Sequence, residues 1–263
     1  MRKKGLYSGK YALYHPTALN LFRHIIFLFV KKTEHFAKVE AALREHPYTS
    51  HRSRIYAPKL GVYAEFNFLK RDPELLLAFF EELKKHNLLT NFQLFSSKHK
   101  QKLLSLNLKK ISIEDFQWNF NWETFQKRLG KVKAKPLPQP AKNVLPELKV
   151  LDLKILRILK NDADISQRAL SRKLAVDRTE VWRRIHFLEE NVIATYKSKI
   201  DQKNFNITSN KILILTFDRE SDLRHFFTAF SDEEIRPPFR YRFEVLEDKK
   251  LLMYISLPQF HEA

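Results

Sequence analysis

The stretch from Leu148 to Ile200 constrains the fold of this chain most, because spacing, capping residues and charge all indicate three short helices there. Apolar residues recur at helical spacing from Val150 to Leu159, which predicts the first helix. Ser166 can cap a second short helix, and Asp177 can cap a third that runs to about Glu190. Three short helices with a tight turn before a basic third one predict a helix-turn-helix.

The third predicted helix, over residues 177–190, has two chemically different faces. Its apolar arc consists of Val181, Ile185 and Leu188. The opposite, polar face consists of Thr179, Arg183 and His186. Residues early in such a helix reach base edges in the major groove, so we expect Arg178, Thr179 and Arg183 to contact bases. Arg184, nearer the apolar arc, should hold phosphate. The full set of predicted DNA contacts is Ser166, Gln167, Arg178, Thr179, Trp182, Arg183, Arg184 and His186.

Three short motifs in this stretch are similar to those of a known family. They are Leu151-Asp152, Ile165-Ser166, and Val181-Trp182-Arg183-Arg184-Ile185 followed by Leu188-Glu189. Over about 50 residues they resemble the leucine-responsive and asparagine-operon regulator family, Lrp/AsnC. The resemblance implies that the third helix reads double-stranded DNA and that a β wing completes a winged helix-turn-helix domain over residues 147–200. It also implies a ferredoxin-like βαββαβ domain, which in the family assembles dimers and often binds a small-molecule effector such as an amino acid.

The chain contains an internal repeat. Residues 1–20 resemble the wing and linker of this family rather than the start of a domain, and the same plan returns 186 positions later. The corresponding residues are Leu6, Tyr7, Leu19, Asn20 and Leu21 in the first copy and Val192, Ile193, Phe205, Asn206 and Ile207 in the second. We therefore expect a tandem arrangement, truncated so that it lacks its first helix-turn-helix.

Residues 21–97 give a complete βαββαβ pattern, expected to form a sensing or assembly domain. The predicted strands are Ile25–Val30, Arg54–Ala57, Val62–Phe68 and Phe92–Phe95, and the helices are marked by Phe36 to Leu43 and by Leu75 to Leu83. Along the third strand, Val62, Ala64, Phe66 and Phe68 alternate with Tyr63, Glu65 and Asn67. Ala64 stands where the family hairpin often carries Asp, which argues against a standard amino-acid ligand.

Residues 98–146 have no counterpart in the simple family plan. They hold a basic run and then alternating aromatic residues, namely Lys98, His99, Lys100 and Lys102, and Phe116, Trp118, Phe120 and Trp122. Such aromatic side chains can stack on unpaired bases. The favoured alternative is that they cover a sheet face or pack one domain on another. The segment Lys131 to Pro146, with four Pro and four Lys, is expected to be a semi-extended linker.

Residues 201–263 repeat the sheet domain only in part. The predicted elements are a strand at Ile212–Phe217, a helix at Leu223–Phe230, and a hairpin of Phe239–Leu246 with Leu251–Leu257. A second helix and a fourth strand are missing, so another element or chain must cover the apolar face. The predicted class is α+β, a winged helix-turn-helix with one complete and one partial ferredoxin-like domain. We expect self-association through these domains, as a dimer or as a pseudo-dimer inside the chain.

The net charge of +18 is unevenly distributed. Residues 1–149 hold 28 Lys and Arg against 12 Asp and Glu, residues 150–200 hold 11 against 7, and residues 201–263 hold 9 against 11. A basic excess of this size favours a polyanionic partner, since each phosphate contact releases counterions. The alternative is that Lys only covers solvated faces.

Other compositional features narrow the function. The absence of Cys excludes disulfides, thiolate zinc sites and cysteine nucleophiles. The ten His are dispersed, and neither a Gly-rich phosphate loop nor a Gly-x-Ser-x-Gly turn occurs, so we expect no metal, no cofactor and no catalytic residue. The longest apolar run, Ile25 to Val30, is too short to span a bilayer, and no secretory signal pattern is visible. We expect a cytoplasmic protein without membrane contact.

The sequence supports three functional hypotheses. The favoured one is a sequence-specific DNA-binding transcription regulator, not an enzyme, because the third helix carries Arg178, Arg183 and Arg184. The resemblance also implies an alternative, since a branch of Lrp-like proteins decarboxylates sirohaem. Binding such a multiply carboxylated tetrapyrrole calls for basic groups focused inside a pocket. The third hypothesis is an architectural protein that coats DNA without fixed sites.

Overall fold

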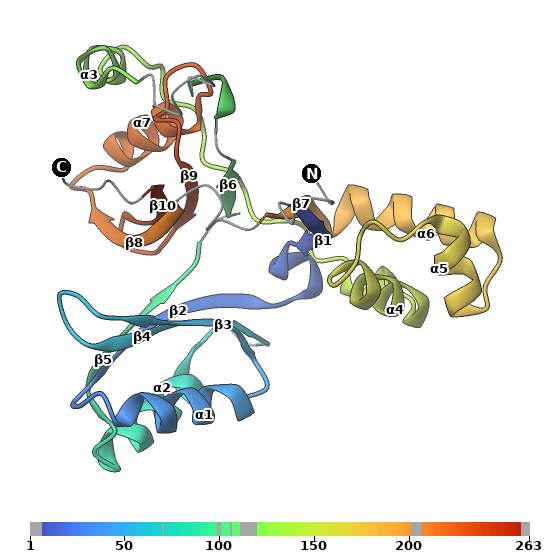
Figure 1. Cartoon of the computed structure of the whole chain (residues 1–263), viewed down its shortest axis with the longest axis horizontal. Helices are drawn as coiled ribbons and strands as arrows, with labels where there is room; N and C mark the ends of the chain where they lie inside the picture. Colours follow the sequence, from blue (N-terminus) through green and yellow to red (C-terminus); the bar gives the residue numbers. More distant parts are fainter. Residues whose placement is uncertain are drawn as a thin grey trace.

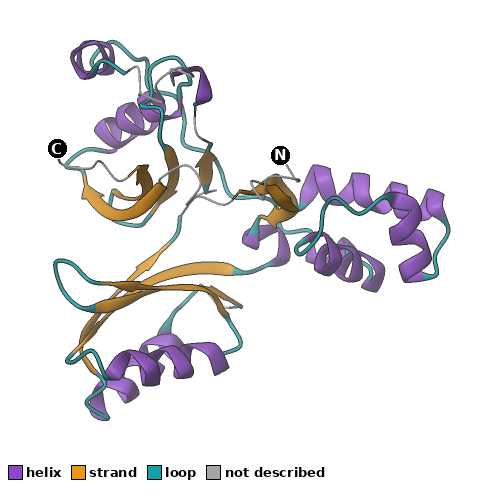
Figure 2. Ribbon diagram, viewed as in Figure 1, coloured by secondary structure: helices purple, strands orange, loops and turns teal. Residues whose placement is uncertain are grey.

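A computed structural model describes residues 7–69, 71–98, 101–105, 107–110, 120–200 and 207–258. The described chain forms a helical head and two four-stranded antiparallel sheets (Figure 1). The two sheets face each other, their helices lie on the outer sides, and the head extends to one side (Figure 2). Several residues singled out in the sequence lie outside the described residues: Leu6, His99, Lys100, Phe116, Trp118, Phe205 and Asn206.

The head contains the three predicted helices. They are α4 (Val150–Leu159), α5 (Gln167–Leu174) and α6 (Arg178–Asn191). Ser166 accepts a hydrogen bond from the amide of Ala169 at 3.2 Å, and Asp177 accepts one from the amide of Thr179 at 2.7 Å. Both predicted helix caps are therefore confirmed. Ala175, at the end of α5, has a left-handed backbone with φ of 53°, which makes the turn into α6 tight.

The wing of the head contains one strand from each copy of the internal repeat. Strand β1 (Tyr7–Tyr14) pairs antiparallel with β7 (Ile193–Ile200), although about 186 residues separate them. The short 3-10 helix η2 (Pro16–Leu19) follows β1. Its Ala18 and the β1 residue Ala12 are buried in the same core as Val181 and Leu188 of α6. The N-terminal wing segment thus completes the core of this head.

The first sheet domain is ferredoxin-like, as predicted. Its elements are β2 (Phe22–Val30), α1 (His35–Glu45), β3 (Thr49–Ile55), β4 (Gly61–Phe68), α2 (Glu74–Lys85) and β5 (Leu89–Ser96), in the sheet order β3-β4-β2-β5. Val62, Ala64 and Phe66 are fully buried in one core with residues of α1 and α2, so they share one face of β4 as predicted. Gly61 is required at the start of β4, because a Cβ there would lie 2.5 Å from the carbonyl oxygen of Leu28.

The second sheet domain is completed by the segment that precedes the head. Its elements are β8 (Ile207–Thr216), α7 (Glu220–Ser231), β9 (Arg240–Val245) and β10 (Lys250–Pro258). From residues 98–146 come a fourth strand, β6 (Lys102–Leu104), and a second helix, α3 (Trp122–Leu129). Phe125 on α3 is buried against Phe230 on α7, with ring centroids 5.1 Å apart. The apolar face left open in the sequence is therefore covered from within the chain.

The added strand does not copy the first domain. In the first domain β5 lies beside β2, the first strand of the βαββαβ unit. In the second domain β6 pairs with β9, at the opposite edge, and within the described residues β8 pairs with β10 alone. The two sheet domains are thus not simple repeats, and residues 98–146 belong partly to the second domain rather than to a separate linker.

The inner faces of the two sheets pack against each other. Ile25 and Tyr63 of the first sheet form one buried cluster with Leu246 and Leu252 of the second. Tyr63 belongs to the alternate face of β4, together with Glu65 and Asn67. Its complete burial shows that β4 is covered on both sides. The chain therefore forms the pseudo-dimer inside the molecule that was one of the two predicted assemblies.

If α3 is an integral part of the second domain, Phe125→Ala should destabilise that domain by about 3 to 5 kcal/mol, because it opens a cavity against α7. Trp122→Ala on the same helix is the control, since Trp122 is 55% exposed and should cost less than half as much. Hydrogen exchange of the β9 and β10 amides measures both effects. Equal protection in wild type and Phe125→Ala would show that α3 is a dispensable attachment.

Candidate functional site

The outward face of α6 carries most of the side chains predicted to contact DNA. Asp177 caps this helix, and the hydrogen bonds donated by the amides of Thr179 and Glu180 lower the pKa of its carboxyl group. The outward-facing residues are Arg178, Thr179, Trp182, Arg183 and His186, all of which are exposed. They form one surface on a helix whose other side is anchored in the core of the head.

Arg184 differs from the other predicted contacts. It is only 5% exposed, and its Nε donates a 2.6 Å hydrogen bond to the carboxylate of Asp152 on α4, which is 0% exposed. The guanidinium also lies over the ring of Phe187, 4.5 Å from its centroid. The predicted phosphate contact of Arg184 is therefore wrong: this side chain joins α6 to α4 and is not available to DNA.

Two other side chains on α6 are held by their neighbours along the helix. Arg183 donates two hydrogen bonds to Glu180, at 2.9 and 2.8 Å, and remains exposed. Trp182 is 50% exposed and stacks on His186, with ring centroids 5.1 Å apart and planes 17° apart. The two stacked rings are both exposed on the same face of α6. The pair with Glu180 orients Arg183 without burying it.

Helix α5 contributes cationic side chains that the predicted set omitted. The cap residue Ser166 is exposed, and Gln167, the first residue of the helix, is half-buried. Arg168, Arg172 and Lys173 are also exposed on α5. In a helix-turn-helix this helix crosses the phosphate backbone, where Arg and Lys are suitable donors. These three residues could have been identified as candidate contacts in the sequence from their positive charge.

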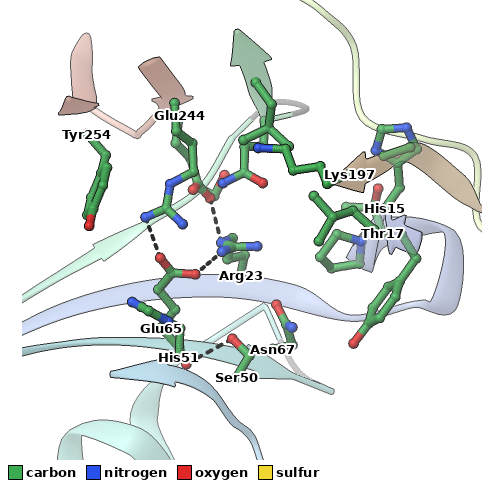
Figure 3. Close-up of a pocket in the computed structure, with 18 of the residues that line it drawn as sticks. His15, Thr17, Arg23, Ser50, His51, Glu65, Asn67, Lys197, Glu244 and Tyr254 are labelled. Carbon is green, nitrogen blue, oxygen red and sulfur yellow. Dashed lines mark hydrogen bonds and ion pairs between the residues drawn. The ribbon is translucent and has the colours of Figure 1, made fainter. Parts of the chain in front are cut away.

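A second candidate site is a cavity of about 440 Å³ where the head meets the two sheets. Its walls come from β1 and η2, from β2 and β4, from β7, and from β9 and β10 (Figure 3). Arg23, Arg242, Glu65 and Glu244 lie at its base and connect the two sheets. Its residues come from distant segments of the chain, so no local pattern in the sequence predicts this cavity.

The charged groups at the base of the cavity form a buried network. Glu65 on β4 pairs with Arg23 on β2 and with Arg242 on β9 of the opposite sheet, and Arg23 Nε lies 3.1 Å from Glu244. Burial alone would raise the pKa of Glu65, but the two guanidinium groups lower it to about 2. Burial raises the pKa of Glu244, and the adjacent Glu65 carboxylate raises it further against the attraction of Arg23. Glu65 is thus the anion that both sheets share.

Lys197 on β7 extends into the cavity from the side of the head, close to His15 and Thr17 (Figure 3). Burial lowers the pKa of its ammonium group to about 7, with further lowering by the positive charges of Arg240 and Arg242. A lysine that titrates near neutrality, beside other cations, is a feature of ligand sites as well as of strained structural positions.

The described part of the chain shows neither a metal-binding cluster nor a membrane-spanning helix. No cluster of His, Asp and Glu there has the grouping that a metal ion needs. No helix within the same residues is long and apolar enough to cross a membrane.

Comparisons with known proteins identify one domain. Residues 150–189 match the AsnC-type helix-turn-helix domain. No curated protein matches the chain. Similar solved structures include the crystal structure of the siroheme decarboxylase NirDL, at 10% identity and a TM-score of 0.49, covering 99% of this chain and 69% of that one. NirDL in co-complex with an iron-uroporphyrin III analogue is similar at 11% identity and a TM-score of 0.47, covering 98% and 68%.

The buried position of Arg184 predicts a stability effect. Arg184→Ala would leave the Asp152 carboxylate buried without its cation, and should destabilise the head by about 3 to 5 kcal/mol. Arg183→Ala removes an exposed pair with Glu180 and should cost less than about 1 kcal/mol. Hydrogen exchange of the α4 and α6 amides compares the two variants. Similar exchange in both would mean that the Asp152 pair does not hold the helices together.

Proposed function

Because its helix-turn-helix is of the AsnC type, the chain belongs to the Lrp/AsnC family, and we propose that it is a transcription regulator that reads duplex DNA with α6. The observation that supports this most directly is the exposed face of α6. It presents Arg178, Thr179 and Arg183 at the start of the helix, where base contacts are made in this motif. The head also extends away from the two sheets, which leaves this face uncovered (Figure 1).

The charge distribution supports a polyanionic partner. On α5, three exposed cations lie beside the α6 face, and the predicted contacts Ser166 and Gln167 are at the start of that helix. Phosphate contacts from α5 would set the register of the head on DNA, while α6 would supply the base contacts. Trp182 and His186 continue the α6 face and are proposed to lie against the sugar-phosphate backbone or the groove wall.

Arg183 is the best test of sequence reading. Arg183→Ala should relax specificity at one base pair, at a cost of about 1 to 3 kcal/mol on the preferred operator. The operator is first selected from random duplexes with the full chain, and affinities for all its single-base variants are then measured by competition. Loss of discrimination at one position, with the others retained, is the expected result.

A matched control for Arg183→Ala is Arg224→Ala. Arg224 pairs with Glu220 one turn away on α7, at 2.9 Å, just as Arg183 pairs with Glu180, but it lies in the second sheet domain. It should leave DNA affinity unchanged. Equal loss on every operator variant for Arg183→Ala would contradict base reading and favour an architectural protein that coats DNA.

A second candidate function is supported by the cavity. Basic side chains gather inside it. A multiply carboxylated tetrapyrrole would need such a site. The alternative proposal is therefore an enzyme of the Lrp-like sirohaem decarboxylase type. The regulator is favoured because the exposed α6 face is of the type that reads DNA and because residues 1–149 carry a large cationic excess.

The enzyme alternative has a simple spectroscopic test. Titration of sirohaem with the purified chain should shift the visible absorption bands if the cavity takes the tetrapyrrole, and Arg240→Gln, which alters a cation of the cavity, should reduce the shift. An unchanged spectrum at equimolar protein would exclude this alternative.

A further inference from the structure

The chain from the last turn of α3 into the linker that follows it is strongly basic. Residues 127–135 carry five cations and no Asp or Glu, namely Lys127, Arg128, Lys131, Lys133 and Lys135. All five side chains are exposed. These five residues are called the α3 basic segment below. They lie outside the helix-turn-helix, so the proposed reading of DNA by α6 does not use their charge.

The cations of the α3 basic segment lack the acidic partners that exposed cations have on other helices. On α7, Arg224 pairs with Glu220 at 2.9 Å, and such pairs along a helix are typical of a solvated face. Among the described residues, no carboxylate forms a salt bridge with the α3 basic segment. Even Glu123, one turn before Lys127 on α3, is not paired with it. The segment therefore presents uncompensated positive charge to the solvent.

The positive charge extends from α3 to the neighbouring 3-10 helix η3 (Leu108–Lys110). Lys110 donates hydrogen bonds to two backbone oxygens between α7 and β9, at 2.8 and 2.9 Å. Burial lowers the pKa of its ammonium group, and the positive charges of Arg236 and Arg128 lower it further against the attraction of Asp232. Arg128 is thus close enough to Lys110 for the two cations to repel each other. A polyanion bound to α3 would relieve this repulsion.

Trp122 adds an exposed aromatic surface at the start of the same helix. Its ring makes T-shaped contacts with Phe120 and Phe125, with centroids 4.9 and 6.0 Å away, yet Trp122 remains 55% exposed. Phe125 is buried in the core of the second sheet domain, so these contacts hold the indole in place. A fixed aromatic ring beside cations is the arrangement in which unpaired bases stack while their phosphates contact Lys and Arg.

An anionic membrane surface would also attract cations, but α3 has little apolar surface left to insert into one. Phe125 is buried and Leu129 is half-buried, and both pack in the core of the second sheet domain. A helix that lies in a membrane interface needs a broad apolar face. On α3 only Trp122 is both apolar and exposed, which favours a nucleic acid.

We propose that α3 and the α3 basic segment bind a nucleic-acid strand with unpaired bases, with Trp122 as the stacking surface and Lys127, Arg128 and Lys131 as phosphate contacts. Helix α3 lies at the end of the second sheet domain that points away from the head (Figure 1). The α3 contact and the α6 contact would therefore engage separate stretches of nucleic acid. This inference does not rest on the proposed function, because it needs no duplex reading by the head.

The test is fluorescence anisotropy of a labelled oligo(dT) of about 20 nucleotides, long enough to cover one such site. With the full chain, Trp122→Ala should weaken binding at least about fivefold, and Trp122→Phe should retain most of the affinity because a ring is still present. Lys127→Gln/Arg128→Gln should also weaken binding at least about fivefold. It should reduce the slope of log affinity against log salt by about 1.4, since two phosphate contacts are lost.

The matched control is Lys38→Gln/Arg44→Gln, which removes the same two charges from exposed positions on α1 of the first sheet domain. It should leave the affinity and the salt slope nearly unchanged. Melting curves show that each variant folds. Equal weakening by the two double variants would overturn the site, because binding would then follow the total charge of the chain.

Three further outcomes separate the alternatives. No effect of Trp122→Ala, with inorganic polyphosphate of matched length binding as tightly as oligo(dT), would overturn recognition of unpaired bases. Binding to phosphatidylserine vesicles without binding to oligo(dT) would assign the surface to a membrane and overturn the proposal. Arg178→Ala/Arg183→Ala should weaken duplex binding and leave oligo(dT) binding intact. Loss of both in this variant would place the oligo(dT) on the head and also overturn the α3 site.

Discussion

The carboxylate of Glu65 is shared by an arginine from each sheet, and the relative position of the two sheets depends on this contact. Arg23 approaches from β2 and Arg242 from β9, while Glu244 provides a second anion within 3.1 Å of Arg23. Removing Glu65 would leave Arg242 without its carboxylate, and removing Arg23 would leave Glu244 buried without a cation. Either loss costs far more than an exposed ion pair contributes. The network therefore fixes the register in which the apolar inner faces meet, while Ile25, Tyr63 and their partners supply the apolar burial.

The network also explains why a cavity exists beside it. Charged groups lose solvation when they are packed at the density of an apolar core, and the cavity adjoins these charged groups. The head borders the same cavity through η2 and the wing strands β1 and β7. The helix-turn-helix is therefore joined to the sheets next to the cavity.

The second sheet shows how a partial repeat becomes a stable layer. Its own strands and α7 leave apolar side chains uncovered, and the preceding segment supplies β6 and α3 to cover them. The apolar side chains must be buried, but any element that covers them is sufficient, whatever its position in the topology. This is why β6 lies beside β9 and not at the edge that β5 occupies in the first domain.

Local patterns in the sequence were sufficient for the helices of the head and their caps at Ser166 and Asp177, because these depend on neighbours a few residues away. They also located the strands of the first sheet except β3, which runs Thr49–Ile55 and not Arg54–Ala57. The exposed face of α6 followed from the same periodicity. The role of Arg184 did not, since its partner Asp152 is on another helix and a basic residue gives the same sequence signal whether it contacts DNA or a buried carboxylate. The pairing of β1 with β7, the recruitment of β6 and α3, and the cavity beside the charged network were decided by tertiary structure alone. Each joins segments 90 or more residues apart, and pairing or charge balance across such separations depends on three-dimensional packing that one-dimensional periodicity does not record.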